Sequence, residues 1–377
     1  MSTSPESLVD RWRALRDRLL ANPRFQRWAA AFPLTRPIAT RQASALFDLV
    51  AGFVYSQVLA ACVRLHLFDH LAAGPRGLDD LARALDLPAA GARRLLDAAA
   101  ALDLVEARGP ERYGLGMLGA ALRGNPGVTA LIEHHDMLYA DLADPLPLLR
   151  GTAAPTRMQQ FWAYARASNG HALEAGQVER YTALMAASQH LVASEILDAY
   201  PVGRHRCLLD VGGGDGSFLA AAAARAPHLA LMLFDLPAVA EQARARLAER
   251  GLADRSTVHG GSFRTDPLPT GADLISLVRV VHDHDDEVAM DLLRCVRAAL
   301  APGGVLLLAE PMADTRGARP MGAAYFGWYL MAMGSGRPRT EAQLQAMAQA
   351  AGFGQCRPAR VRRPLMTRVL VCSDRLR

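Results

Sequence analysis

The chain has 377 residues, 51% of them hydrophobic, and a formal net charge of +5 carried entirely by arginine, since no lysine occurs. This length and apolar content predict two domains of ordinary size. A basic excess of this size is more typical of a solvated surface than of a nucleic-acid-binding protein. The five cysteines are odd in number, scattered and without CxxC spacing. They argue for a reducing compartment, and against a disulfide framework and a zinc site.

Two features near the N-terminus bear on targeting. Met1–Asp10 is polar and acidic, unlike a signal peptide. The longest uncharged apolar run, Leu49–Val63, has 15 residues, short of the ~20 needed to span a bilayer. We therefore expect a soluble protein, or one associated at most with a membrane surface.

Residues 1–40 combine aromatic side chains with many arginines and predict a basic amphipathic arm. The aromatic residues are Trp12, Phe25, Trp28 and Phe32. Two interpretations stay open, namely an arm packed on a partner subunit and an arm that contacts a membrane surface.

Residues 41–127 predict a winged-helix-like domain. An apolar helical stretch over 43–70 is followed by two helices and a hairpin, at Leu78–Leu85, Ala90–Leu102, Leu104–Glu106 and Arg112–Leu115. In a DNA-binding domain of this kind Ala90–Leu102 would be the recognition helix, but it offers only Arg93 and Arg94. Major-groove readers need several polar side chains at base edges, so a packing role is favoured.

The rest of the chain changes from helical to alternating strand and helix. Residues 128–200 predict a helical connecting region with breaks at Pro145, Pro147 and Pro155, and residues 201–377 predict the ligand-binding domain. Strands are expected at Cys207–Val211, Ala230–Phe234, Ser256–His259, Leu274–Val280, Gly304–Ala309 and Arg368–Cys372, with helices near 217–225, 238–250, 286–299 and 341–351. This alternation predicts an α/β fold with a largely parallel, doubly wound, Rossmann-like sheet.

A glycine-rich turn follows the first of these strands. Glycines let the backbone adopt positive φ and let a ligand lie against the main chain. The spacing is G-x-G-x-G, which is typical of S-adenosylmethionine sites. Dinucleotide sites instead have G-x-G-x-x-G. The candidate cofactor-binding residues of the strand and turn are Asp210, Gly212, Gly213, Gly214 and Gly216.

Acidic and histidine residues come at the ends of later strands. Asp235, followed by Leu236, lies about 20 residues past the turn, where a carboxylate can accept hydrogen bonds from ribose hydroxyls; capping the helix from Pro237 is the alternative. His282-Asp283-His284 follows another strand and suits a general-base histidine at His282 better than a metal site. Glu310 ends the next strand and can orient that histidine, or simply be an edge carboxylate in water.

These landmarks, in this order behind a winged-helix front end, resemble the plant-type O-methyltransferases that use S-adenosylmethionine. The resemblance runs from about Ala45 to the C-terminus. It implies a class I methyltransferase domain, a dimerisation module that contributes to the partner's substrate pocket, His282-Asp283 as the catalytic pair, and Glu310 as its orienting carboxylate. Further cofactor-binding candidates are Gly261, Ser262, Phe263 and Arg279.

Three positions depart from the family pattern. The family's adenine-binding Asp is replaced in Gly260-Gly261-Ser262-Phe263, so that Ser262 or the backbone would hold the adenine. Its HDW becomes His282-Asp283-His284, and Pro338 stands where a second catalytic carboxylate often precedes Arg339-Thr340.

Ala29–Phe68, Val281–Asp286 and Gly334–Thr340 resemble the hydroxycarotenoid O-methyltransferases of purple bacteria. The implied reaction is methylation of the tertiary C1 hydroxyl of an acyclic carotenoid. Alternatives are a bacteriochlorophyll precursor or a phenol as acceptor, or a winged-helix regulator that only senses a ligand. A small lipophilic substrate, a homodimer, no nucleic acid, no metal and a cytoplasmic location at or near the photosynthetic membrane are expected.

An apolar, aromatic segment over residues 323–333 is the candidate wall of the substrate pocket. Met185, Trp328, Tyr329 and Met333 would line a slot for a polyene. An ordinary core helix explains the same apolar pattern equally well.

Overall fold

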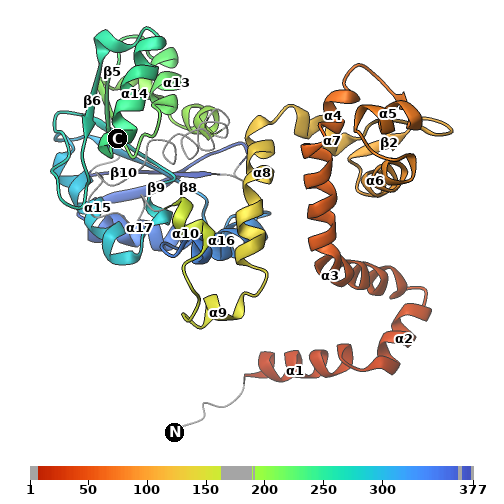
Figure 1. Cartoon of the computed structure of the whole chain (residues 1–377). Helices are drawn as coiled ribbons and strands as arrows, with labels where there is room; N and C mark the ends of the chain where they lie inside the picture. The colour runs from red at the N-terminus through yellow and green to blue at the C-terminus, as the bar shows by residue number, and fades with distance from the viewer. Residues whose placement is uncertain (1–6, 163–188, 190–191, 364–366, 375–377) are drawn as a thin grey trace. The chain divides into compact units, whose positions relative to one another are not determined.

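A computed structural model describes residues 7–162, 189, 192–363 and 367–374 (Figure 1). The chain divides into two compact units, one ending at Ala121 and the other beginning at Leu122. The sequence predicts the end of the winged-helix-like domain slightly later, at residue 127. Met185 lies outside the described residues.

The first unit is mainly helical. Its helices are α1 (Leu8–Leu20), α2 (Pro23–Ala31), α3 (Arg36–Arg64), α4 (Leu67–His70), α5 (Leu78–Ala84), α6 (Ala89–Ala101) and α7 (Met117–Arg123), the last of which crosses into the second unit. Strands β1 (Arg76–Gly77), β2 (Val105–Ala107) and β3 (Arg112–Leu115) form an antiparallel sheet in the order β1-β3-β2. The helices and hairpin have the predicted winged-helix arrangement.

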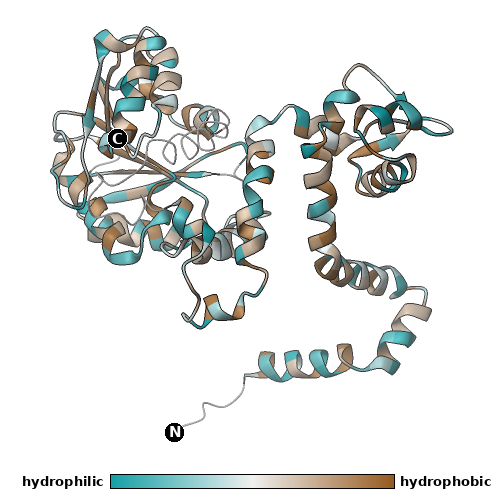
Figure 2. Cartoon of the chain, viewed as in Figure 1, coloured by the Kyte–Doolittle hydropathy of each residue, from teal (hydrophilic) through white to brown (hydrophobic). Residues whose placement is uncertain are grey.

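Helix α3 is longer than its uncharged apolar core suggested. It runs for 29 residues, and it is the one helix within the described ranges that is long and apolar enough to cross a membrane by length and composition. Phe47, Leu49, Val50 and Phe53 are all more than half exposed, and Figure 2 shows the helix as largely apolar. An apolar patch of this size on an exposed helix indicates a surface that is buried against a partner molecule or a membrane.

The second unit contains a seven-stranded sheet in the order β6-β5-β4-β7-β8-β10-β9. The strands are β4 (Cys207–Val211), β5 (Ala230–Asp235), β6 (Ser256–Gly260), β7 (Leu274–Val278), β8 (Val305–Glu310), β9 (Gln355–Ala359) and β10 (Arg368–Ser373). Strands β4 to β8 pair in parallel, whereas β10 is antiparallel to β8 and β9. The predicted doubly wound fold is confirmed, with a mixed rather than purely parallel sheet.

Alternate residues of the central strands enter two separate cores. Leu208 faces α13 (Ser217–Arg225) and α14 (Pro237–Glu249), while Leu209 belongs to the core beside α15 (Asp286–Ala299) and α17 (Glu341–Ala350). Because side chains alternate across a strand, a sheet covered on both faces requires apolar residues at nearly every position, as in β4, β7 and β8.

The remaining elements are short or lie before the sheet. They are α8 (Pro126–Asp141), α9 (Leu146–Leu149), α10 (Arg157–Phe161), α16 (Phe326–Met333), a π-helix at Pro320–Tyr325, and 3-10 turns at Val202–Arg204, Ala253–Arg255 and Val281–Asp283. A third core joins α8, α10 and α16.

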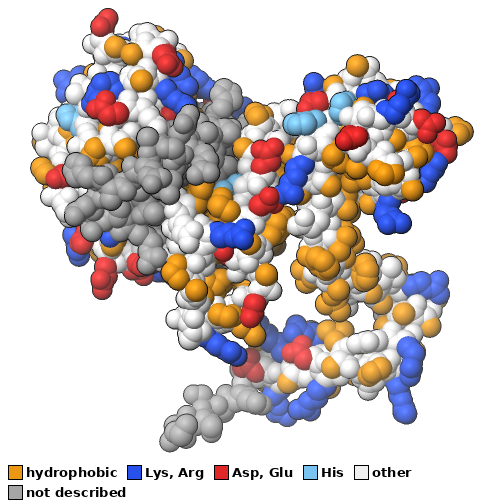
Figure 3. Space-filling view, viewed as in Figure 1, with side chains coloured by type: hydrophobic (Ala, Val, Ile, Leu, Met, Phe, Trp, Pro, Cys, Tyr) orange, Lys and Arg blue, Asp and Glu red, His pale blue; other side chains and the backbone are white. Residues whose placement is uncertain are grey.

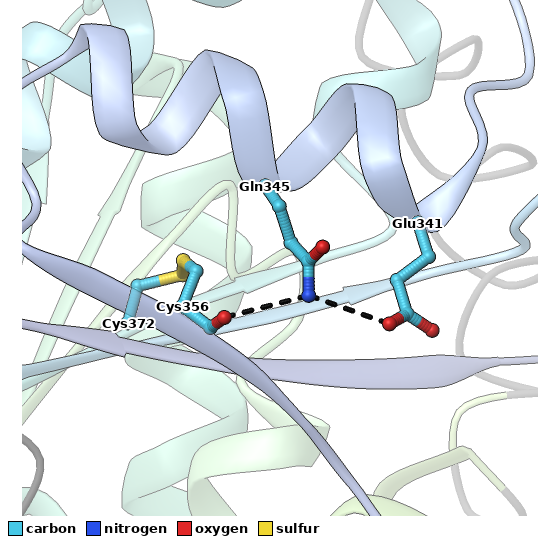
Figure 4. Close-up of a disulfide and its surroundings, with 4 residues drawn as sticks. All are labelled: Glu341, Gln345, Cys356 and Cys372. Atoms are coloured by element: carbon cyan, nitrogen blue, oxygen red, sulfur yellow. Dashed lines mark hydrogen bonds between the residues drawn. A yellow bond between two sulfur atoms is a disulfide. The ribbon is translucent and has the colours of Figure 1, made fainter.

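Strand β9 and its disulfide were not predicted. Cys356 pairs in register with Cys372 of β10, and the two side chains form a disulfide (Figure 4). This single pair departs from the expectation that the scattered cysteines form no disulfide framework. Strand β9 was missed because it is a polar edge strand that contains Pro358, and proline is tolerated only at such edges.

Candidate active site

The carboxyl ends of β4 and β5 build the first part of the site. Gly212 and Gly214 both have positive φ, 69° and 57°, which L side chains rarely adopt. The N–H of Gly214 donates to Asp235 Oδ2 at 2.8 Å, and the N–H of Leu236 donates to Asp235 Oδ1 at 2.7 Å. The glycine turn and the acid after β5 are thus held together, as the sequence analysis expected of residues that share one site.

Two carboxyl groups in this region have raised pKa values. Burial raises the pKa of Asp210 to about 7, against the hydrogen bond from Ser276 Oγ. Burial likewise raises the pKa of Asp235 to about 6, opposed by its two backbone hydrogen bonds. Among the described residues, Asp210 Oδ2 is buried without a hydrogen-bond partner.

These features fit S-adenosylmethionine. A side chain built on Gly214 would meet nothing within 4 Å, so a ligand has room to approach the backbone there. Asp235 retains lone pairs for ribose hydroxyls beyond the two it uses. Gly213 and Gly216 complete the turn, with Gly216 at the start of α13.

The adenine end is built differently from the family pattern. Ser262 is buried and its N–H donates to Asp266 Oδ2 at 2.8 Å, while the N–H of Gly261 donates to the carbonyl of Asp235 at 2.9 Å. Asp266 therefore supplies a carboxylate four residues after Gly-Ser. Asp266 is not apparent as a site residue from the sequence, because only the structure shows this turn folding back.

Phe263 and His284 meet beside that turn. Their rings lie 5.1 Å apart, edge to face. His284 is buried, with Nδ1 lacking a partner, and burial lowers its pKa to about 3. His284 is therefore neutral. No cluster of three or more potential metal ligands occurs among the residues that the structure covers.

The catalytic candidates converge where β7 and β8 end. Strand β7 stops at Val278, two residues earlier than predicted, because Arg279 turns the chain with φ 57°. The turn directs the N–H groups of Val280 and Val281 at Glu310 Oε1, at 3.0 and 2.7 Å. Arg279 itself donates to Gln189 Oε1 at 2.8 Å.

Glu310 also holds His282. Its Oε2 accepts a short hydrogen bond from His282 Nδ1, so the geometry assigns the proton to Nδ1 and leaves Nε2 as the basic nitrogen. Asp283 Oδ1 lies 3.2 Å from Nε2, near enough to stabilise an imidazolium. The sequence placed these three residues together as a base with two carboxylates, and the structure has them in contact.

Opposing effects set the charge of this group. Burial lowers the pKa of His282, but the charges of Asp283 and Glu310 and the Glu310 hydrogen bond outweigh it, so the pKa is raised. Burial raises the pKa of Asp283 to about 6, opposed by the charge of His282. The histidine therefore readily holds a proton that it has accepted.

Arg339 fixes the loop that carries His282, and sequence reasoning did not identify it as a site residue. It is fully buried and donates to the carbonyls of Val281 and His284, each at 2.8 Å, and to Asp286. The signal available in the sequence was its place directly after Pro338, which stands where the family often has a second carboxylate. The structure shows the position serving the loop's geometry.

The aromatic segment after β8 flanks the same histidine. The ring of Phe326 lies 6.0 Å from that of His282, and Tyr325 lies 5.1 Å from Phe326. Tyr329 and Met333 are buried in the core of α8, α10 and α16, whereas Trp328 is 39% exposed. Of the predicted pocket residues on α16, two are core-facing and one faces outward.

Two histidine–tyrosine pairs tie α8 to this segment. His134 Nε2 lies 2.9 Å from the hydroxyl of Tyr329, and His135 Nε2 lies 2.8 Å from that of Tyr325. Burial lowers the pKa of His134 to about 4 and also lowers the pKa of His135, so both are neutral. The pairs satisfy polar atoms beside the apolar core that α8, α10 and α16 share.

Comparison with known proteins places the two units in one family. Residues 142–354 match an O-methyltransferase domain, and residues 47–123 match an O-methyltransferase dimerisation domain. Demethylspheroidene O-methyltransferase of Cereibacter sphaeroides is 45% identical over 340 residues, 90% of this chain and 89% of that protein. The Rhodobacter capsulatus protein of the same name is 41% identical over 90% of this chain and 84% of its own. The structure of human N-acetylserotonin methyltransferase in complex with SAM shares the fold, with a TM-score of 0.71 at 23% identity over 89% of this chain and 98% of that one.

Proposed function

The chain belongs to the S-adenosylmethionine-dependent O-methyltransferase family, and we propose that its acceptor is the tertiary C1 hydroxyl of an acyclic hydroxycarotenoid. The observation that carries this substrate is the 45% identity over 90% of the chain to a demethylspheroidene O-methyltransferase. The ring of Phe326, 6.0 Å from that of His282, supports it, because a polyene needs apolar side chains beside the base that receives its one polar end.

The cofactor, when bound, supplies an electrophilic methyl group on a sulfonium. Gly212–Gly216, Asp235 and the Gly261–Phe263 turn would hold it. Fixing donor and acceptor in reactive geometry supplies much of the rate.

His282 moves the proton. A tertiary alcohol is a weak nucleophile with a pKa of the order of that of water, ~15.7, so a base must take its proton as the C–O bond forms. Nε2 is the basic nitrogen because Glu310 holds Nδ1–H. Asp283, 3.2 Å from Nε2, then stabilises the imidazolium beside Glu310.

We further propose a homodimer formed through the first unit, since residues 47–123 match the family's dimerisation domain. We also propose a cytoplasmic location. A DNA-reading role finds little support in α6, where the guanidinium of Arg93 is paired with Glu111.

The test is methyl incorporation by the purified protein from labelled S-adenosylmethionine into a panel of 1-hydroxycarotenoids, phenols and bacteriochlorophyll precursors. We expect label only in the carotenoids, at the C1 oxygen by mass spectrometry. His282→Ala should lower kcat by about 10²- to 10⁴-fold with cofactor affinity retained. Methylation of a phenol or a tetrapyrrole with none of the carotenoids would overturn the substrate assignment.

A further inference from the structure

Helix α1 carries a continuous apolar stripe that no described residue of the first unit covers. Its residues follow one another at spacings of four, three and four, so that they share one face of a helix with about 3.6 residues per turn. None of the residues of α1 is buried. The stripe consists of Leu8, Trp12, Leu15 and Leu19, exposed by 82, 64, 55 and 43%.

The charges of α1 are ordered around that stripe. The same helical geometry places Arg11 and Arg18 along one flank of the stripe and Arg13 and Arg16 along the other. Asp10 and Asp17 lie opposite the stripe. Arg16 contacts Asp17 at 2.7 Å and Arg13 lies 3.8 Å from Asp10, but both pairs are exposed, and such pairs contribute little in water.

Helix α2 continues the surface with aromatic rings. Trp28 lies 5.6 Å from Phe25 and stacks on Phe32 at 5.3 Å. Trp28 and Phe32 are 52% and 41% exposed. Stacked, half-exposed aromatic rings next to arginines are characteristic of segments that lie in the headgroup region of a bilayer.

The charge of the whole chain is concentrated here. Residues 7–36 contain seven arginines and two aspartates, a formal net charge of +5, which equals the net charge of all 377 residues. Figure 3 shows basic and apolar side chains side by side along α1 and α2. Both helices precede the residues that match the dimerisation domain, 47–123.

We propose that α1 and α2 form an interfacial anchor that docks on an anionic lipid bilayer. The stripe inserts between headgroups, the flanking arginines reach the lipid phosphates on both sides, and the two aspartates face water. A second copy of the same arm is a poorer occupant, because two like arms brought together along their stripes place arginine against arginine. An anionic membrane instead complements the charge along the entire length of α1.

The anchor has a functional consequence. A lipophilic acceptor resides in a membrane, so an enzyme held at the surface meets it at high local concentration. The inference is independent of which acceptor is correct, since the test below uses no acceptor and no cofactor.

The experiment is flotation of the full-length protein with vesicles of phosphatidylcholine alone or mixed with an equal part of phosphatidylglycerol. A charge variant replaces four arginines of α1, a stripe variant carries Trp12→Ser and Leu15→Ser, and a matched control removes four exposed arginines elsewhere. Light scattering records the oligomeric state of each. The charge variant is Arg11→Gln, Arg13→Gln, Arg16→Gln and Arg18→Gln, and the control is Arg150→Gln, Arg250→Gln, Arg294→Gln and Arg362→Gln.

We expect the native chain and the control to float with the anionic vesicles and to be released by salt. Because a basic residue near an anionic surface contributes about 1 kcal/mol, each arginine removed from α1 should weaken partition about fivefold. The stripe variant should lose flotation while keeping the native oligomeric state. Absence of flotation by the native chain, equal loss in the control, or a stripe variant that floats normally but dissociates into monomers would each overturn the anchor, the last by assigning the arm to a second copy.

Discussion

Glu310 gives the sharpest test of how this site works, because one carboxylate does two separable jobs. Its Oε1 accepts from the N–H groups of Val280 and Val281, and its Oε2 accepts from His282 Nδ1. Glu310→Gln keeps a carbonyl oxygen for the two backbone donors, whereas Glu310→Ala removes every acceptor. The two variants should therefore differ in stability but not in their loss of catalysis.

The expected magnitudes follow from these contacts. In Glu310→Gln the side-chain NH₂ faces Nδ1, so that Nδ1 must accept and Nε2 must carry the proton, which abolishes the base. We expect kcat to fall by about 10²- to 10⁴-fold. In Glu310→Ala two buried N–H groups also lose their acceptor, at about 1–3 kcal/mol each, so the free energy of unfolding should fall by roughly 2–6 kcal/mol.

The assays are methyl transfer for kcat, calorimetric titration for cofactor affinity, and denaturant unfolding for stability. Glu249→Gln, an exposed carboxylate at the end of α14, is the matched control and should behave as the native chain. A Glu310→Gln enzyme with kcat within about threefold of the native value would refute the assignment of the tautomer to Glu310. Loss of cofactor affinity alone would move its role to binding.

Three further predictions concern the pH response, the glycine turn and the disulfide. The pKa of His282 is raised, so activity should rise with pH to a plateau reached above the ordinary histidine pKa of about 6.5, and a flat profile of activity against pH would contradict the base. The same group should contribute stability that is present below pH ~6.5 and lost as pH rises through the raised pKa. Ala at Gly212 combines a left-handed φ with a valine methyl 2.8 Å from the new Cβ, whereas Ala at Gly214 has only the left-handed φ. Gly212→Ala should therefore lower the free energy of unfolding by more than the ~1–2 kcal/mol expected for Gly214→Ala. Equal losses of stability in thermal unfolding would count against the clash. The Cys356–Cys372 disulfide links residues 16 positions apart, so reduction or Cys356→Ser should lower the free energy of unfolding by about 3 kcal/mol. Denaturant unfolding with and without dithiothreitol measures this, and an unchanged unfolding midpoint would mean that the bond does not stabilise the fold.

The sequence alone determined the parts of this protein that are coded locally. Asp235 and Glu310 end strands, and the G-x-G-x-G turn and His282 follow strands. Strand ends can be read from a sequence because apolar runs stop at them. Parallel strands then bring those ends to one edge of the sheet. The order of the landmarks was therefore enough to predict the fold, the cofactor and the base.

The tertiary structure decided the partners of those residues. The two N–H groups on Glu310 and the Arg339 hydrogen bonds join residues far apart in the chain. The left-handed turn at Arg279 and the hydrogen bond from Ser262 to Asp266 are local, but no periodicity encodes them. Their positions depend on strand register and loop closure.

The same is true of β9 and the side of α16 that faces the core. The Cys356–Cys372 pairing follows from the register of β9 against β10, an edge strand without an apolar pattern. Tyr329 turns inward to His134 because a buried hydroxyl requires a partner, and only the packing of α8 supplies one. The sequence therefore predicts the kind of chemistry, whereas the packing determines which side chains hold the reacting groups in place.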